Sequence, residues 1–198
     1  MKSQLQKLIN GNVLTDGDPG YEAARKVWNG MIDRKPALIA QCTSSNDIAA
    51  AVKFARKNNL IVSVRGGGHN VAGNAVCEAG LMIDLSKMKA IHVDVVNKTA
   101  TAEPGVLWVE FDDATIPLGL ATTGGTVSDT GIAGLTLGGG LGWLMGKHGT
   151  TCDNLLSAEM ITADGEQIKV DKTNNADLYW AIRGGGGNFG IVSKFEYQ

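Results

Sequence analysis

The sequence predicts an α+β protein, because one strand–helix–strand unit is followed by several antiparallel hairpins. Residues 36–64 contain two apolar runs on either side of an amphipathic helix that begins at Ser44 or Ser45. Residues 91–102 and 155–170 each contain two strand-like runs joined by a short polar turn. Glycine, 27 of 198 residues, is gathered in four clusters rather than spread at a fixed period, which excludes collagen-like and low-complexity chains.

The remaining elements follow from local start and stop signals. Residues 3–10 predict a short helix that ends at Gly11, and residues 22–29 predict a second helix that ends at Gly30. Residues 104–113 predict a helix with proline at its first position. The other predicted elements are strands over residues 81–85 and 191–197 and a helix over residues 177–182.

Charge and cysteine content limit the classes of function. The formal net charge is −2, and acidic and basic residues are mixed without a basic stripe, so nucleic-acid binding is not expected. No run is long and apolar enough to cross a membrane, and the N-terminus lacks a signal-peptide pattern. The three cysteines are odd in number and form no Cys-x-x-Cys pair, which favours a reducing, cytoplasmic location over a disulfide framework.

The loop at residues 64–70 (Val-Arg-Gly-Gly-Gly-His-Asn) is the first candidate for a binding site. It follows an apolar strand, and its three glycines let a ligand approach the backbone N–H groups, which form a concave anion site in such turns. Arg65 adds a permanent positive charge that suits phosphate, and His69 offers a nucleophilic nitrogen. The alternative is a flexible turn with a solvent-facing His69, and this loop alone favours neither interpretation.

A second glycine cluster, residues 124–142, is apolar where a solvent loop would be polar. The expected purpose is close packing of the backbone against a flat or extended ligand, and the alternative is tight helix packing through small residues. A last glycine loop at residues 183–190 precedes the final strand. No Gly-x-Gly-x-x-Gly opens a helix after the strand that begins at Pro36, so the dinucleotide-binding fingerprint is missing.

Four motifs, in order along the chain, resemble one family. They are Arg-Gly-Gly-Gly-His at residues 65–69, the run of residues 131–142, Gly-Thr-Thr-Cys-Asp-Asn at residues 149–154 and Gly-Asn-Phe-Gly-Ile-Val at residues 187–192. From about Ala37 onward the sequence resembles the PCMH-type FAD-binding domain of the vanillyl-alcohol oxidase superfamily. It is most similar to the bacterial berberine-bridge-enzyme-like branch of FAD-linked oxidases.

The resemblance implies one two-lobed FAD-binding domain over residues 1–198, with FAD between a lobe of about residues 1–103 and a lobe of about residues 104–198. It also implies two covalent bonds to FAD, from His69 to the 8α-methyl group and from Cys152 to flavin C6. The residues implied to bind the cofactor are Val64, Arg65, Gly66, Gly67, Gly68, His69, Asn70, Thr126, Val127, Gly131, Gly134, Leu137, Gly138, Gly139, Gly142, Cys152, Asn154, Asn188, Phe189, Gly190, Ile191 and Val192.

The implied function is that of a covalent flavoprotein oxidoreductase. It would pass a hydride from a small organic donor to flavin N5, with reoxidation by O2 and broad or weak substrate selectivity. The family's substrate domain and catalytic Tyr base have no counterpart in these residues. No residue is therefore assigned as the substrate base, weak activity is expected, and exposed apolar surface is expected to cause self-association.

Two other functions are weighed against this one. An FAD-carrying electron-transfer module that needs a partner chain for substrate binding is the main alternative. A phosphate-ligand protein without flavin is the third interpretation, and it leaves His69 and Cys152 without a role.

The remaining cysteines and histidines, with Trp143, carry structural expectations. Cys42 is expected to be a small buried hydrophobic residue, and Cys77 is a lesser candidate for a flavin bond. His92 is expected at the surface. For His148, a surface or packing role is favoured over one of reaching the flavin or tuning Cys152. For Trp143, a place in the core is favoured over packing on the cofactor.

Overall fold

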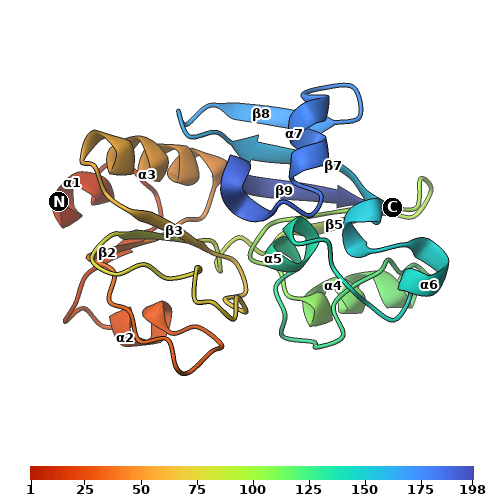
Figure 1. Cartoon of the computed structure of the whole chain (residues 1–198), viewed down its shortest axis with the longest axis horizontal. Coiled ribbons are helices and arrows are strands. Elements are labelled where there is room, and N and C mark those ends of the chain that lie inside the picture. The colour runs from red at the N-terminus through yellow and green to blue at the C-terminus, as the bar shows by residue number, and fades with distance from the viewer.

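Two β-sheets, arranged end to end along the molecule, form the framework of the chain (Figure 1). The computed structural model describes all residues, 1–198. The first sheet contains, in spatial order, β1 (Asn12–Leu14), β2 (Leu38–Gln41), β4 (Leu81–Asp84) and β3 (Val62–Arg65). The second contains β5 (Ile91–Asp94), β6 (Thr99–Ala102), β9 (Ile191–Tyr197), β7 (Leu155–Ile161) and β8 (Gln167–Asp171).

Strand direction differs between the two sheets. In the first sheet, β2 and β3 both run parallel to β4, which lies between them, and β1 is antiparallel to β2. In the second sheet, every pair is antiparallel. The predicted strand–helix–strand unit is therefore present, but its two strands are not neighbours. The combination confirms the α+β class.

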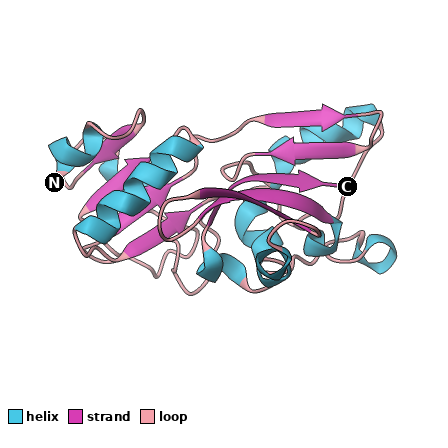
Figure 2. Cartoon of the chain, turned by 90° about the horizontal axis from the view of Figure 1, so that it is seen from above, coloured by secondary structure: helices cyan, strands magenta, loops and turns pink.

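Helix α3 (Ser45–Lys57) packs on the first sheet and also contacts two strands of the second, β7 and β9 (Figure 2). Ser44 caps it as expected, because its hydroxyl accepts from the backbone N–H of Asp47 at 3.2 Å. The buried face of α3 packs with the first sheet and also with Ile161 of β7 and Ile191 of β9. Two side chains of the second sheet therefore belong to the core of the first half, while the rest of the second half has a core of its own.

A buried carboxylate fixes the start of α3. Burial alone would raise the pKa of Asp47, but backbone N–H groups of Asn10 and Thr43 donate to its oxygens at 2.8 and 2.9 Å and hold the pKa below its usual value. Asp47 thus ties the loop before β1 to the first turn of the helix.

An aromatic cluster holds the second half together. Trp108 and Phe111 of α4 (Trp108–Thr115) pack against Tyr197 of β9, with ring centroids 6.3 and 5.4 Å from the tyrosine ring. The Tyr197 hydroxyl lies 2.8 Å from the hydroxyl of Thr136 on α5 (Ile132–Leu137). These contacts fix α5, which carries part of the second glycine cluster, against the sheet.

Several elements differ from their predicted bounds. Helix α4 begins at Trp108 rather than at residue 104, because the N–H of Gly105 donates to Met88 and the N–H of Trp108 donates to Thr130. Strand β1 was not predicted, since three residues carry little pattern. The helices α1 (Lys2–Gln6) and α2 (Tyr21–Arg25) are shorter than expected. The remaining elements are α6 (Met145–His148), α7 (Ala176–Ala181) and short 3-10 turns at Ile116–Leu118, Thr151–Asn154 and Gly186–Phe189.

The change from one sheet to the other occurs between Asp84 and Ile91, earlier than the expected lobe boundary near residue 103. The reason is that the β5–β6 hairpin pairs with β9 instead of with the first sheet. No helix is both long and apolar enough to span a bilayer.

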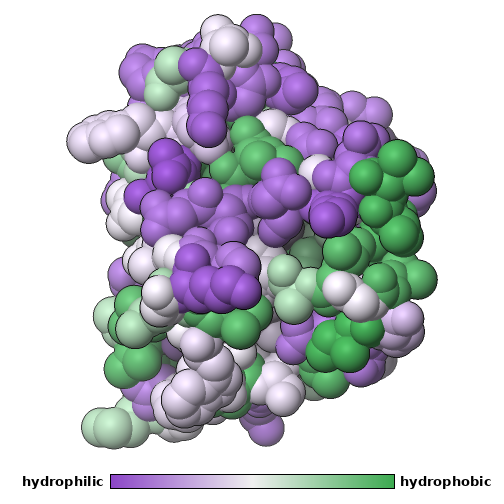
Figure 3. All heavy atoms as spheres, turned by 90° about the vertical axis from the view of Figure 1, so that its right-hand side faces the viewer, coloured by the Kyte–Doolittle hydropathy of each residue, from purple (hydrophilic) through white to green (hydrophobic).

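The expectation that Trp143 lies in the core is wrong. Its residue is 86% exposed, and the neighbouring Leu141 is also exposed, whereas Gly142 between them is buried against the carbonyl of Gly124. Leu144 and Met145 add further exposed apolar surface. Figure 3 views this end of the molecule, where apolar side chains gather along one edge.

Candidate functional site

A cleft of about 930 Å³ opens where three segments from both halves of the chain meet. These segments are the loop that follows β3, the helix α5 with the residues before it, and the start of β9 with the loop before it (Figure 1). The sequence-predicted site residues that line the cleft are Val64, Gly66, Gly67, Gly68, His69, Asn70, Gly131, Gly134, Leu137, Gly138, Asn188, Gly190, Ile191 and Val192. The structure thus brings three of the four motifs together.

The first glycine loop rests directly on the second glycine cluster. A Cβ atom on Gly67 would lie 2.4 Å from the backbone nitrogen of Gly131, and a Cβ on Gly131 would lie 2.4 Å from the nitrogen of Gly67. Around this contact, the N–H of Ile132 donates to the carbonyl of Val106 at 3.0 Å. Glycine is required on both sides because two backbones touch here.

The backbone N–H groups of residues 66–70 donate to no acceptor within the protein. All five residues line the cleft. Successive N–H groups without a protein acceptor in a concave, glycine-rich loop form a cradle that suits a ligand with acceptor oxygens. No lysine or arginine side chain lines the cleft, so an anion there would be held by these N–H groups and by neutral side-chain donors such as Thr130 and Asn188.

Glycines of the second cluster serve two purposes. A Cβ on Gly134 of α5 would meet no atom within 4 Å, and Gly134 lines the cleft. In contrast, Gly124 and Gly125 pack on the Trp108 ring, and Gly140 packs on Thr151. Close packing through small residues is therefore observed at Gly124, Gly125 and Gly140, whereas packing of Gly134 against a ligand stays a prediction.

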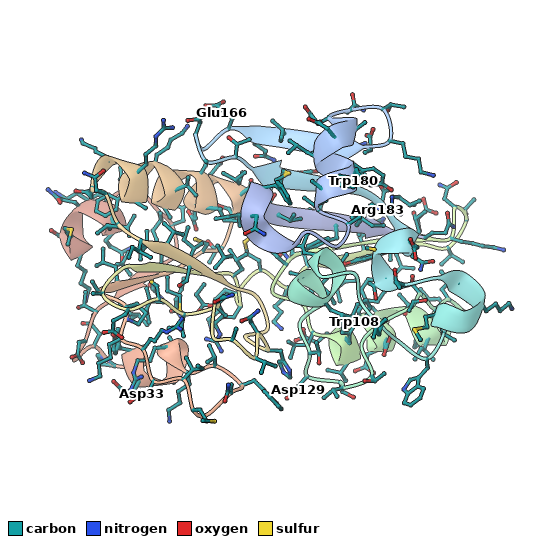
Figure 4. The ribbon with its side chains drawn as sticks, viewed as in Figure 1. Asp33, Trp108, Asp129, Glu166, Trp180 and Arg183 are labelled. Carbon is teal, nitrogen blue, oxygen red and sulfur yellow. The ribbon has the colours of Figure 1, made fainter.

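His69 is sheltered at the edge of the cleft. Its side chain is 20% exposed, and its Nε2 atom lies 3.4 Å from Oδ1 of Asp129, which belongs to the loop before α5. Its ring stacks on Trp28, with centroids 5.5 Å apart and planes 24° apart. Figure 4 shows the Asp129 side chain at the junction of the two halves. The alternative of a solvent-facing His69 is wrong.

Arg65 does not face the cleft. Its guanidinium donates to the carbonyl of Ala24 at 2.6 Å, and it lines a separate cavity of about 410 Å³ that also borders Asp84. Alternation along β3 places Val64 on the cleft and turns the next side chain to the other face. The expected positive charge beside the loop is therefore directed elsewhere.

Cys152 is not among the residues that line the cleft. It is buried, its sulfur is 3.4 Å from the Thr150 hydroxyl, and its N–H donates to Gly139, the residue after the cleft-lining Gly138. Its carbonyl accepts from Nε of Arg183 at 2.8 Å, a residue labelled in Figure 4. The other predicted site residues that do not line the cleft are Thr126, Val127, Gly139, Gly142, Asn154 and Phe189.

Asn154 has a structural task beside Cys152. Its side-chain amide donates to the carbonyls of His148 and Thr150, which closes the turn that carries the cysteine. Hydrogen bonds from the hydroxyl and N–H of Thr150 hold the pKa of Asp153 below its usual value. The motif at residues 149–154 is consequently a rigid support for the thiol.

The other cysteines and histidines lie outside the cleft. Cys42 is fully buried, and burial raises the pKa of its thiol, so it behaves as the predicted small hydrophobic residue. Cys77 is also buried. His92 and His148 are exposed, in line with their surface assignments.

Sequence reasoning missed Trp28 and Asp129, the two partners of His69. Both are distant from the histidine along the chain, and the contact exists only after the two halves pack. A charged residue within an apolar glycine cluster was the one local signal that could have singled out Asp129.

Comparison with known proteins identifies the family. Residues 36–171 match the FAD binding domain model. (R)-6-hydroxynicotine oxidase of Paenarthrobacter nicotinovorans is 38% identical over 96% of this chain and 42% of its own length. The FAD-linked oxidoreductase pgmH of Aspergillus terreus is 40% identical over 98% of this chain and 40% of its own length. The chain spans about two fifths of the length of these relatives.

Solved structures agree with the sequence relatives. The crystal structure of 6-hydroxy-D-nicotine oxidase from Arthrobacter nicotinovorans superposes with a TM-score of 0.94 at 38% identity, covering 96% of this chain and 42% of that one. The BBE-like 1 protein of Physcomitrella patens superposes with a TM-score of 0.92 at 27% identity, covering 100% and 44%. The chain therefore belongs to the FAD-binding domain family of the vanillyl-alcohol oxidase type, among the berberine-bridge-enzyme-like FAD-linked oxidoreductases.

Proposed function

We propose that the cleft binds FAD, that His69 and Cys152 attach it covalently, and that the protein oxidises small organic donors. The observation that carries this proposal is the row of free N–H groups at residues 66–70, which ends beside the sheltered imidazole of His69. This arrangement places donors for a pyrophosphate next to a group that can bond the flavin.

The cleft fits FAD in size and lining. Its volume of about 930 Å³ is near the upper end of the range for small-molecule sites, about 300–1,000 Å³. Gly134 leaves open space over α5, where a flat ring can approach the helix backbone. Leu135, Leu137 and Val192 supply an apolar lining beside it.

Bound FAD would supply the two-electron acceptor for a hydride from the donor and would return the electrons to O2. The chain's own residues bind and orient it: the N–H groups of the loop hold the phosphates, and His69 and Cys152 fix the ring. A relative supports the two bonds, because glucooligosaccharide oxidase from Acremonium strictum, 34% identical, is described with a 6-S-cysteinyl, 8α-N1-histidyl FAD. No cleft residue is assigned as the substrate base, so we expect broad selectivity.

Intact mass under denaturing conditions tests the proposal, with wild type, His69→Ala, Cys152→Ala and the double variant. We expect the wild type and both single variants to carry one FAD and the double variant to carry none. Cys77→Ala is the matched control, because it removes a buried thiol outside the cleft. A wild-type mass equal to the bare chain would overturn the covalent bonds while leaving non-covalent binding to be measured by flavin fluorescence.

Hydrogen peroxide production with a panel of alcohols and sugars tests the oxidase activity. Turnover supports the proposed reaction. If the flavin is reduced by light but no donor is oxidised, the chain carries electrons without a substrate site of its own.

A further inference from the structure

We propose that Thr150 and Asp153 form a proton relay that carries the thiol proton of Cys152 to water when the sulfur bonds the flavin. The inference rests on the proposed function, since it concerns how the second attachment residue loses its proton. Its basis is a continuous chain of hydrogen bonds that leads from the buried sulfur to an exposed carboxylate.

The thiol of Cys152 is almost closed off from solvent. The residue is 7% exposed, and its sulfur has one hydrogen-bond partner, the Thr150 hydroxyl at 3.4 Å. The backbone around it is fixed, because the Cys152 N–H donates to the carbonyl of Gly139 at 2.9 Å and its carbonyl accepts from Nε of Arg183 at 2.8 Å. A thiol must lose its proton to bond carbon, so the proton leaves through the partner that the fold provides.

The direction of these hydrogen bonds follows from the carboxylate. Hydrogen bonds from the hydroxyl and N–H of Thr150 hold the pKa of Asp153 below its usual value, so Asp153 is ionised at neutral pH and only accepts. The single hydrogen of the Thr150 hydroxyl is therefore given to Oδ2 of Asp153, at 2.7 Å. Toward the sulfur, the same hydroxyl oxygen is an acceptor, and the S–H of Cys152 donates to it.

Arg183 holds the outer end of the relay in place. One of its terminal nitrogens donates to Oδ1 of Asp153 at 3.3 Å, which leaves Oδ2 to Thr150. Its guanidinium also lies over the Tyr179 ring, 5.1 Å from the centroid. The Asp153 side chain is 51% exposed, so a proton that reaches it passes on to water.

Each proton in the bond-forming step has a destination. A bond forms between the sulfur and flavin C6, and the S–H and C6–H bonds break. The thiol proton moves to the Thr150 oxygen, the hydroxyl's own proton moves to Asp153 and then to water, and the C6 proton also leaves to water. The two electrons pass to O2, the acceptor of the proposed oxidase reaction, which takes up two protons and becomes H2O2. The attached protein is therefore heavier by one FAD less two hydrogens.

The first experiment needs no flavin. Carbon-13 NMR of the Cys152 Cβ in mixtures of water and deuterium oxide measures how fast the thiol hydrogen exchanges with solvent. We expect Thr150→Val, which keeps the shape of the side chain without the hydroxyl, to slow this exchange at least about tenfold. Thr150→Ser keeps the hydroxyl and should exchange within about twofold of wild type. Equal exchange rates in Thr150→Val and wild type would overturn the relay.

The second experiment measures attachment in a His69→Ala background, so that only Cys152 can bond the flavin. Non-covalent FAD binding is measured first for each variant, and the rate of covalent attachment is then followed by intact mass. We expect Thr150→Val to slow attachment about a hundredfold, the lower end of what general-base catalysis contributes. Thr150→Ser should restore the rate to within about threefold of the parent, because the hydroxyl is kept.

Asp153→Asn separates proton transfer from charge. Its amide oxygen can still accept from the Thr150 hydroxyl but takes up no proton, so attachment should slow about tenfold, with solvent water replacing the carboxylate in part. If the carboxylate acted through its charge alone, this variant would attach FAD faster, because a negative charge disfavours a second one nearby. Thr173→Val is the matched control: it removes a hydroxyl that donates to Asp171 at 2.8 Å outside the cleft, and it should leave the rate unchanged.

The outcomes separate the relay from the proposed function. Attachment to Cys152 at the same rate in Thr150→Val and in the parent overturns the relay and leaves the bond to FAD in place. Faster attachment in Asp153→Asn also overturns the relay. If every variant binds FAD but none bonds it through Cys152, the second covalent bond of the proposed function fails, and the relay fails with it.

Discussion

Two glycine-rich walls of the cleft contain glycine for different physical reasons. Where Gly67 meets Gly131, two backbones touch, and no Cβ fits on either side. In the last loop, Cβ atoms on Gly184, Gly186 and Gly187 would meet no close contact, but the first two have φ values of +121° and +73°. Gly67 and Gly131 thus need glycine for room, whereas Gly184 and Gly186 need it for backbone conformation, so the same residue type predicts different costs of substitution.

Gly131→Ala should cause the largest loss of stability among these substitutions. Gly131 has φ −71° and ψ 137°, which alanine adopts freely, so the whole cost comes from the contact with Gly67. We expect a loss of about 3 kcal/mol in the free energy of unfolding, because backbone on both sides cannot move aside. Urea unfolding measures it, and a loss below about 1 kcal/mol would contradict the close contact.

Gly124→Ala should cause the second-largest loss of stability, because its Cβ would lie 2.6 Å from the buried Trp108 ring. We expect a loss of about 2 kcal/mol, from overpacking against a side chain that has no free space. In the Trp108→Phe background the same substitution should cost at least about 1 kcal/mol less, since the smaller ring gives room. Equal costs in the two backgrounds would place the strain elsewhere.

Gly134→Ala should have effects of opposite sign on stability and on binding. The residue lies inside α5 with open space around it, so alanine should add about 0.5–1 kcal/mol to the free energy of unfolding. The added methyl group enters the cleft, and we expect FAD affinity to fall about tenfold, or about 1.4 kcal/mol. Thermal unfolding without FAD and fluorescence titration with FAD separate the two effects.

The smallest effect should come from Gly187→Ala. Gly187 has φ −85° and nothing within 4 Å of a Cβ, so we expect a change within about 0.5 kcal/mol. Gly184→Ala in the same loop is the control, and it should cost about 1–2 kcal/mol because of its positive φ. If both variants behave alike, the distinction between room and conformation fails for this loop.

The sequence predicted an element correctly where the element's own residues carried a clear pattern. The Ser44 cap, the strands β4 and β9, and the two hairpins lie close to their predicted positions because each depends on neighbouring residues. The first loop was a candidate site only in combination with the other three motifs, and the structure places its residues 66–70 in the lining of the cleft.

Local sequence patterns did not predict the features below. Pro104 was taken as a helix start, but residues 104–107 lie between Met88 and Thr130 and take their hydrogen bonds there. Arg65 was placed at the cleft because of its neighbours in sequence, whereas strand alternation turns it away. Trp143 was placed in the core by residue type, although its stretch of chain runs along the surface. For residues 104–107 the deciding partners come from other parts of the chain, whereas Arg65 follows from alternation along its own strand, which the sequence analysis did not apply.

The position of β9 has a consequence for how the chain is made. It lies between β6 and β7, so the hairpin of β5 and β6 is synthesised about 90 residues before the strand that covers its edge. At about 5–20 residues per second, that edge stays open on the ribosome for roughly 5–20 seconds. The β7–β8 hairpin waits in the same way for a shorter time. Two open edges on one nascent chain invite pairing with other chains, so the yield of this protein in cells should depend on protection by chaperones until residues 191–197 emerge.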